Sequence, residues 1–190
     1  MSVIIQIALF VRKKFDGGML KMGYVHVYTG NGKGKTTAAL GLALRAICAG
    51  KKVYIGQFIK GMHYSELEAV KYLPNLLIEQ YGRGCFIRGK PTEEDVKLAH
   101  TGLKRVREIL ESNAFDIVIL DEINVALFYR LLDVSEVLEL IANRPHDVEL
   151  ILTGRYAPKE IIEVADLVTE MVEVKHYYQQ GVVARKGIEF

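Results

Sequence analysis

Short runs of β-branched and other apolar residues alternate along this chain with longer segments in which apolar residues recur every three or four positions. A short apolar run is typical of a buried strand, whereas the longer periodic segments are typical of amphipathic helices. Strands are predicted over residues 24–28, 53–59, 76–81, 116–120, 148–152 and 167–174. Helices are predicted over residues 36–49, 134–142 and two further segments that begin at Thr92 and Pro158.

Several helix ends are marked by their residue chemistry. Gly50 follows the Ala- and Leu-rich segment 36–49, as glycine commonly does at a helix C-terminus. Thr92 precedes three acidic residues, and basic residues follow in the later turns, an order that suits the helix dipole. Asp133, with Glu136 three residues later, forms the start of a capping box.

The segment Thr29–Thr37, between the first strand and the first helix, has the composition of a phosphate-binding loop. Its three glycines allow successive backbone N–H groups to point at phosphate oxygens, Lys35 can reach the phosphates, and Thr36 can bind Mg²⁺. The usual pattern begins with glycine, whereas Thr29 stands in that place. A glycine-rich turn that merely joins strand to helix is the alternative, but the flanking elements and the intact Gly-Lys-Thr favour phosphate.

A phosphate loop within alternating strands and helices defines the fold class. We predict an α/β fold: a doubly wound, mostly parallel sheet of five to six strands with helices on both faces, of the P-loop NTPase or RecA-like type. Residues 23–190 are expected to form a single P-loop α/β domain. Residues 1–22 are an N-terminal extension, which either packs on the domain or precedes a true start at Met19 or Met22.

Charged residues follow two other predicted strands, where ligands of such sheets bind. Asp121 and Glu122 come directly after an apolar run, and carboxylates there suit Mg²⁺. Arg155 follows another strand and is suited to bind phosphate, although a surface salt bridge is the alternative. Arg45, two to three turns into the first helix, is either a phosphate contact or an ordinary solvated cation.

Composition excludes several classes of function. The net charge of +2 in 190 residues gives no bulk attraction for nucleic acid. The apolar run 3–11 is shorter than the roughly 20 residues that span a bilayer, and the basic residues 12–14 follow it, so that neither a membrane span nor a secretory signal is predicted. Two cysteines outside any C-x-x-C pattern make a reducing cytoplasm the expected compartment.

A phosphate loop alone leaves three classes open: a kinase or NTPase, a regulatory ATPase with a macromolecular partner, and an enzyme that uses ATP for another group transfer. The loop 30–39 resembles that of the ATP:corrinoid adenosyltransferases. The similarity continues, in order, through the following blocks: 57–61, 120–122, 152–155, 174–176 and 187–190. These blocks extend to the C-terminus, and Thr29 is itself shared with that family.

The resemblance implies transfer of the 5′-deoxyadenosyl group of ATP to cobalt(I) of a corrinoid, with tripolyphosphate released. It implies that the nucleotide lies reversed in the loop, with its terminal phosphate deepest and its ribose C5′ facing the corrinoid. By the same resemblance, Lys35, Thr36, Glu122 and Arg155 carry the chemistry, and Thr36 and Glu122, with Asp121, bind Mg²⁺. ATP would be bound by Gly30, Asn31, Gly32, Lys33, Gly34, Lys35, Thr36, Thr37, Arg45 and Arg155.

The corrinoid side rests on the loop 82–87, where the family places apolar or aromatic side chains that exclude water and the lower axial ligand. Phe86 is the expected aromatic wedge, although a core position is its alternative, and Ile87 and Phe58 are expected beside it. Cys85 is expected to be a packed thiol, and His63 and His176 to be structural. The family also implies a homodimer and an electron-donor protein.

Overall fold

The computed structural model describes residues 22–84 and 89–190, so that most of the N-terminal extension and the loop residues Cys85, Phe86 and Ile87 lie outside the described part. The strands are β1 (Val25–Thr29), β2 (Val53–Lys60), β3 (Leu76–Gly84), β4 (Ile117–Asp121), β5 (Glu149–Thr153) and β6 (Leu167–Glu170). The α-helices are α2 (Lys35–Cys48), α3 (Glu93–Glu111), α4 (Ile123–Phe128), α5 (Val134–Asn143) and α6 (Lys159–Val164). Two 3₁₀ helices are η1 (Ser65–Lys71) and η2 (Tyr177–Gln180).

The six strands form one parallel sheet in the order β3-β2-β4-β5-β1-β6. Strand β5 pairs with both β1 and β4, and β2 pairs with the other side of β4. Because parallel strands end at the same edge of a sheet, the segments that follow β1, β2, β4 and β5 meet there. The predicted phosphate loop and the predicted carboxylates are therefore brought together by topology.

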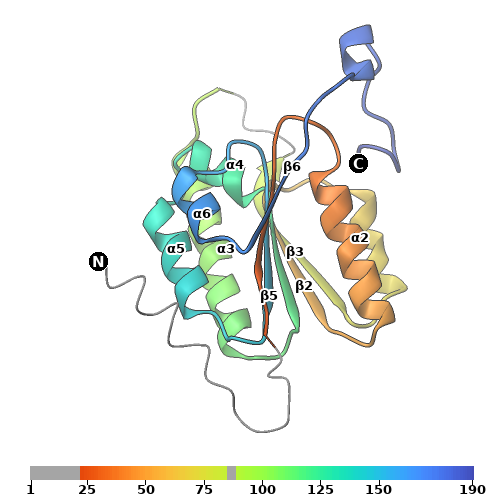
Figure 1. Ribbon diagram of the computed structural model, residues 1–190. Helices are drawn as coiled ribbons and strands as arrows, with labels where there is room; N and C mark the ends of the chain where they lie inside the picture. Colours follow the sequence, from red (N-terminus) through yellow and green to blue (C-terminus); the bar gives the residue numbers. More distant parts are fainter. Residues whose placement is uncertain (1–21, 85–88) are drawn as a thin grey trace, which may run out of the picture.

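Helices cover both faces of the sheet, as Figure 1 shows: α2 lies on one face, and α3, α5 and α6 lie on the other. Small side chains of α2, Ala39, Ala43 and Ala46, pack with strand residues such as Ile119 and Ile151 in one core cluster. The larger core cluster lies with the helices of the other face. All five residues of β4 are buried, as expected of a strand covered on both sides. Within the described ranges, no helix is both long and apolar enough to cross a membrane.

The predicted fold class is confirmed, with differences at the ends of elements. The last strand ends at Glu170 and not at residue 174, because its partner β1 ends at Thr29, opposite Glu170, and turns into the phosphate loop. The short elements α4, η1 and η2 were not predicted, since four to seven residues hold too little periodicity to be recognised. The caps at Thr92 and Asp133 form as predicted.

Candidate active site

The phosphate loop lies between β1 and α2, with Lys35 folded back into it. Lys35 Nζ donates to the carbonyl oxygens of Gly30 (2.8 Å) and Gly32 (2.7 Å), and only 7% of the residue is exposed. Burial lowers the pKa of Lys35, while the nearby carboxylates of Glu122 and Asp121 act in the opposite direction. The loop thus contains a buried cation at the N-terminus of a helix, where anions are stabilised.

Glycine is required in this loop by both conformation and space. Gly30 has a φ of +93° and Gly34 a φ of +122°, a region that L-residues rarely adopt. A Cβ at Gly30 would collide with the carbonyl oxygen of Met171, which also accepts a hydrogen bond of 2.7 Å from the Gly32 amide. The segment after β6 therefore lies directly against the loop.

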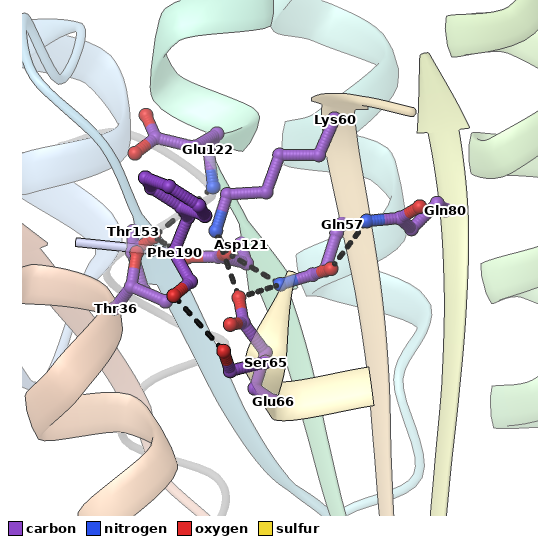
Figure 2. Close-up of polar contacts among 10 residues, drawn as sticks. All are labelled: Thr36, Gln57, Lys60, Ser65, Glu66, Gln80, Asp121, Glu122, Thr153 and Phe190. Atoms are coloured by element: carbon purple, nitrogen blue, oxygen red, sulfur yellow. Dashed lines mark hydrogen bonds and ion pairs between the residues drawn. The ribbon is translucent and has the colours of Figure 1, made fainter. Parts of the chain in front are cut away.

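Asp121, the last residue of β4, is the most heavily hydrogen-bonded side chain of the site and is 1% exposed. Its Oδ1 accepts from the hydroxyls of Thr36 (2.9 Å) and Thr153 (2.7 Å). Its Oδ2 accepts from Lys60 Nζ (2.8 Å) and Gln57 Nε2 (3.2 Å). Four donors, from strands β2 and β5 and from the phosphate-loop helix α2, therefore converge on one carboxylate (Figure 2).

Glu122 adopts a left-handed conformation (φ 60°), and its amide donates to Thr153 Oγ1 at 3.0 Å. Figure 2 shows its carboxylate directed away from that of Asp121. Burial and the charge of Asp121 raise the pKa of Glu122, whereas the positive charges of Lys60, Lys35 and Arg155 act against this rise. A partly buried carboxylate among cations is suited to bind a cation together with an anionic ligand.

The donor set fits a magnesium ion that is shared with phosphate. Thr36 gives its single hydroxyl hydrogen to Asp121, so that its lone pairs remain to act as a ligand. Glu122, the residue that follows β4, adds a carboxylate at the same end of the sheet. No group of three or more His, Cys, Asp or Glu residues in the described ranges could hold a metal ion by itself. Mg²⁺ commonly binds with one or two protein groups, substrate phosphates and water, which is the arrangement this set allows.

The structure brings some predicted residues to the cradle and places others elsewhere. Arg155 is exposed, yet it lies within electrostatic reach of the site, because its charge contributes to the lowered pKa of Lys35 and opposes the rise in the pKa of Glu122. Arg45 is exposed in the last turn of α2, about 15 Å along the helix axis from Lys35 at 1.5 Å per residue. This chain alone therefore does not bring Arg45 to the phosphate loop.

Phe58 was expected to contact the corrinoid, but the structure places it in the core. It is fully buried, and its ring lies 5.7 Å from the ring of Tyr81. The reason is that β2 is an interior strand with β3 on one side and β4 on the other, and helices cover both faces of the sheet. Phe58 therefore has no surface to offer a ligand in this structure.

The C-terminal segment reaches back to the phosphate loop. Lys33 Nζ forms an ion pair of 2.7 Å with Glu189 Oε1 and donates to the Tyr177 hydroxyl at 2.9 Å. Ser65 donates to the backbone oxygen of Phe190 at 2.9 Å. Figure 2 shows the ring of Phe190 in the same region as Thr36 and Glu122. Lys33 was predicted to bind ATP, and any phosphate that it binds must compete with Glu189.

Lys60, Gln57, Thr153 and Glu66 belong to this site but were not assigned to it from the sequence. Gln57 Nε2 also donates to Glu66 Oε1 at 3.0 Å, and Gln57 is fully buried. The available signal was a glutamine and a lysine near the end of an otherwise apolar strand, since such polar residues need partners when buried.

Comparisons with known proteins point to one family. A family model described as "ATP:corrinoid adenosyltransferase BtuR/CobO/CobP" matches residues 21–190. The corrinoid adenosyltransferase of Sinorhizobium sp is 38% identical over 88% of this chain and 80% of its own length. That of Escherichia coli K12 is 36% identical over 95% of this chain and 94% of its own length. Among solved structures, the RadB recombinase has a TM-score of 0.52 at 15% identity, over 84% of this chain and 79% of its own, which is a likeness of fold alone.

Proposed function

This chain belongs to the ATP:corrinoid adenosyltransferase family, and on that premise we propose that it transfers the 5′-deoxyadenosyl group of ATP to cobalt(I) of a corrinoid. The electron pair of cobalt(I) forms the bond to C5′, and the C5′–O bond breaks. Its electrons leave with the oxygen of the departing tripolyphosphate. The observation that carries the proposal is the cradle itself, in which Lys35 lies inside a glycine loop, directly before Thr36 and within electrostatic reach of Glu122.

The chemistry of this step explains which residues the site requires. A reduced metal carries no proton, so no general base is needed to activate it. The difficulty is the negative charge that develops on the departing oxygen. The loop amides, Lys35 and Arg155 are suited to stabilise that charge, because preorganised donors in a water-poor site act most strongly on developing charge. We assign Lys35, Thr36, Glu122 and Arg155 as the residues that carry the reaction.

We further propose that the triphosphate lies reversed, with its terminal phosphate deepest in the loop 30–37 and C5′ toward the corrinoid. This orientation puts the buried cation Lys35 against the terminal phosphate, where its charge stabilises the tripolyphosphate leaving group as a whole. Magnesium is proposed to be held by Thr36 and Glu122, where it would act as a Lewis acid on the phosphate oxygens. Asp121 is assigned to orient Thr36, since its acceptor positions are taken by four protein donors.

The corrinoid is proposed to lie against the loop that follows β3, where Phe86 and Ile87 supply apolar surface. This loop begins at the same edge of the sheet as the phosphate loop, since β3 is parallel to β2. Such surface would exclude water and the lower axial ligand from cobalt. Phe58 is not part of this proposal, because its side chain is buried in the core.

We also propose a cytoplasmic homodimer that receives electrons from a donor protein. A reducing compartment suits a cobalt(I) substrate and a chain without a C-x-x-C pattern. The edge strand β6 supports association, because Leu167 and Val168 are each 42% exposed and the outer edge of β6 is unpaired in the described sheet. Light scattering of the purified protein tests this: a mass of one chain at micromolar concentration would contradict the dimer.

The activity is tested by incubating the full chain with ATP, Mg²⁺ and chemically reduced cobalamin. We expect an adenosylated product whose absorbance spectrum changes on exposure to light, together with tripolyphosphate. Lys35→Ala and Glu122→Ala should both abolish product, and Lys159→Met on the exposed side of α6 is the control. Formation of ADP and phosphate without an adenosylated corrinoid would contradict the proposal.

A further inference from the structure

Lys60 is a buried cation at the end of β2, on the strand next to the one that carries Asp121. Only 8% of the residue is exposed. Its Nζ lies 2.8 Å from Asp121 Oδ2, 3.4 Å from Glu66 Oε1 and 4.8 Å from the centre of the Tyr64 ring. A lysine is rarely buried to this degree without paired charges, and here two carboxylates face it.

The two oxygens of Asp121 are divided between two groups of donors. Gln57 and Asp121 stand opposite one another in the β2–β4 pairing, and Gln57 and Lys60 both donate to Oδ2. The other oxygen, Oδ1, accepts only from the hydroxyls of Thr36 and Thr153 within the described residues. The donors from β2 therefore fix which oxygen is left for the two threonines, as Figure 2 shows.

Both threonine contacts lead to the residues assigned to magnesium. Thr36 gives its hydrogen to Asp121, so that its lone pairs are directed away from that carboxylate. Thr153 bridges Asp121 to the backbone amide of Glu122, which holds the start of α4 in place. A shift of Asp121 would therefore move both proposed magnesium ligands together.

We propose that Lys60 is a positioning residue for the magnesium–triphosphate complex: it clamps Asp121, and through Asp121 it orients Thr36 and Glu122. The inference rests on the proposed magnesium site. It differs from a role in phosphate binding, because Lys60 would act on nucleotide affinity only through the metal. Burial opposes the charge of Lys60, but the carboxylates of Asp121 and Glu66 more than offset this, so that its pKa is raised and it remains a cation.

The test measures ATP binding calorimetrically with Mg²⁺ and again with EDTA, in the wild type, Lys60→Met, Lys60→Arg and the control Lys159→Met. We expect Lys60→Met to weaken binding at least about tenfold with Mg²⁺, the loss of roughly one hydrogen bond to a charged group. With EDTA the change should be less than about threefold, and Lys60→Arg should recover part of the affinity for MgATP. Equal losses with and without Mg²⁺ would overturn the inference and make Lys60 a direct phosphate ligand.

A double-mutant cycle covers the case in which Lys60→Met leaves Asp121 unpaired and fails to fold. Asp121→Asn and Asp121→Asn/Lys60→Met should bind MgATP with equal affinity, because Lys60 has no carboxylate left to position. A further loss in the double variant would overturn the inference. If the wild type itself binds ATP equally with Mg²⁺ and with EDTA, the magnesium proposal fails first, and that outcome is separate from failure at Lys60 alone.

Discussion

The substitution Lys35→Met removes the buried cation of the phosphate loop and keeps a side chain of similar length. In the described structure Lys35 Nζ donates only to the carbonyl oxygens of Gly30 and Gly32, so that ATP must draw the charge toward its phosphates or share it with them. A hydrogen bond to a charged group contributes about 1.5–3 kcal/mol. The affinity for ATP should therefore fall roughly 10- to 150-fold in Lys35→Met, at about 1.4 kcal/mol per factor of ten.

The stability of the free protein should change much less, because two effects oppose one another. The variant loses two hydrogen bonds to loop carbonyls, which destabilises the fold. It also no longer buries a positive charge, and the cost of that burial is what lowers the pKa of Lys35 in the wild type. We expect the free energy of unfolding to change by no more than about 1 kcal/mol in urea titrations, the scale of a typical net hydrogen bond. If the free energy of unfolding changed by more than the free energy of ATP binding, Lys35 would mainly hold the loop together.

The assay is calorimetric titration of the wild type and Lys35→Met with ATP, and separately with tripolyphosphate. Because Lys35 is assigned to phosphate alone, both ligands should lose affinity by the same factor. Lys159→Met, whose side chain is 86% exposed, is the matched control and should bind both ligands normally. An unchanged affinity for tripolyphosphate in Lys35→Met would refute the assignment.

Three further predictions concern packing, pH and the C-terminal segment. Gly102→Ala should lower the free energy of unfolding by about 1 kcal/mol, because a Cβ would lie 2.6 Å from the Tyr81 ring and overpacking outweighs the gain in helix propensity. Urea unfolding measures the change, and a more stable variant would contradict the prediction. The hydrogen bond from Arg83 lowers the pKa of Asp95 to about 2, below its unfolded value of about 3.9. Ionised Asp95 therefore stabilises the fold above pH 4, and this contribution is lost as the pH falls toward 2. Asp95→Asn should therefore cost about 1 kcal/mol at pH 7, allowing for screening, and progressively less as the pH falls through 2. An equal cost at both pH values would contradict this prediction. Glu189→Gln should strengthen ATP binding by less than about threefold, because it frees a loop lysine from a partly exposed ion pair, and weaker binding would show that Glu189 aids the nucleotide.

The phosphate loop could be predicted from sequence because its signal is local. Glycine spacing, a lysine and a hydroxyl residue stand within Thr29–Thr37, between a recognisable strand and helix. Glu122 was likewise marked by the apolar run that precedes it. These features need no knowledge of strand order.

The role of Lys60 could not be predicted in the same way, since it depends on which strands are neighbours. Gln57 meets Asp121 only because β2 pairs with β4, although 64 residues separate the two side chains. The same pairing buries Phe58, which was expected at a ligand surface. Arg45 fails to reach the loop for a simpler reason, the length of the helix between them.

The central claim is that the site breaks the C5′–O bond of ATP and not a phosphorus–oxygen bond. It is tested most directly with ATP that carries ¹⁸O in the bridge between C5′ and the α-phosphorus, incubated with the full chain, Mg²⁺ and a reduced corrinoid. Mass spectrometry should find the label in tripolyphosphate, with one tripolyphosphate formed for each adenosylated corrinoid. Label that remains on an adenosine-containing product, or release of ADP, would contradict the account.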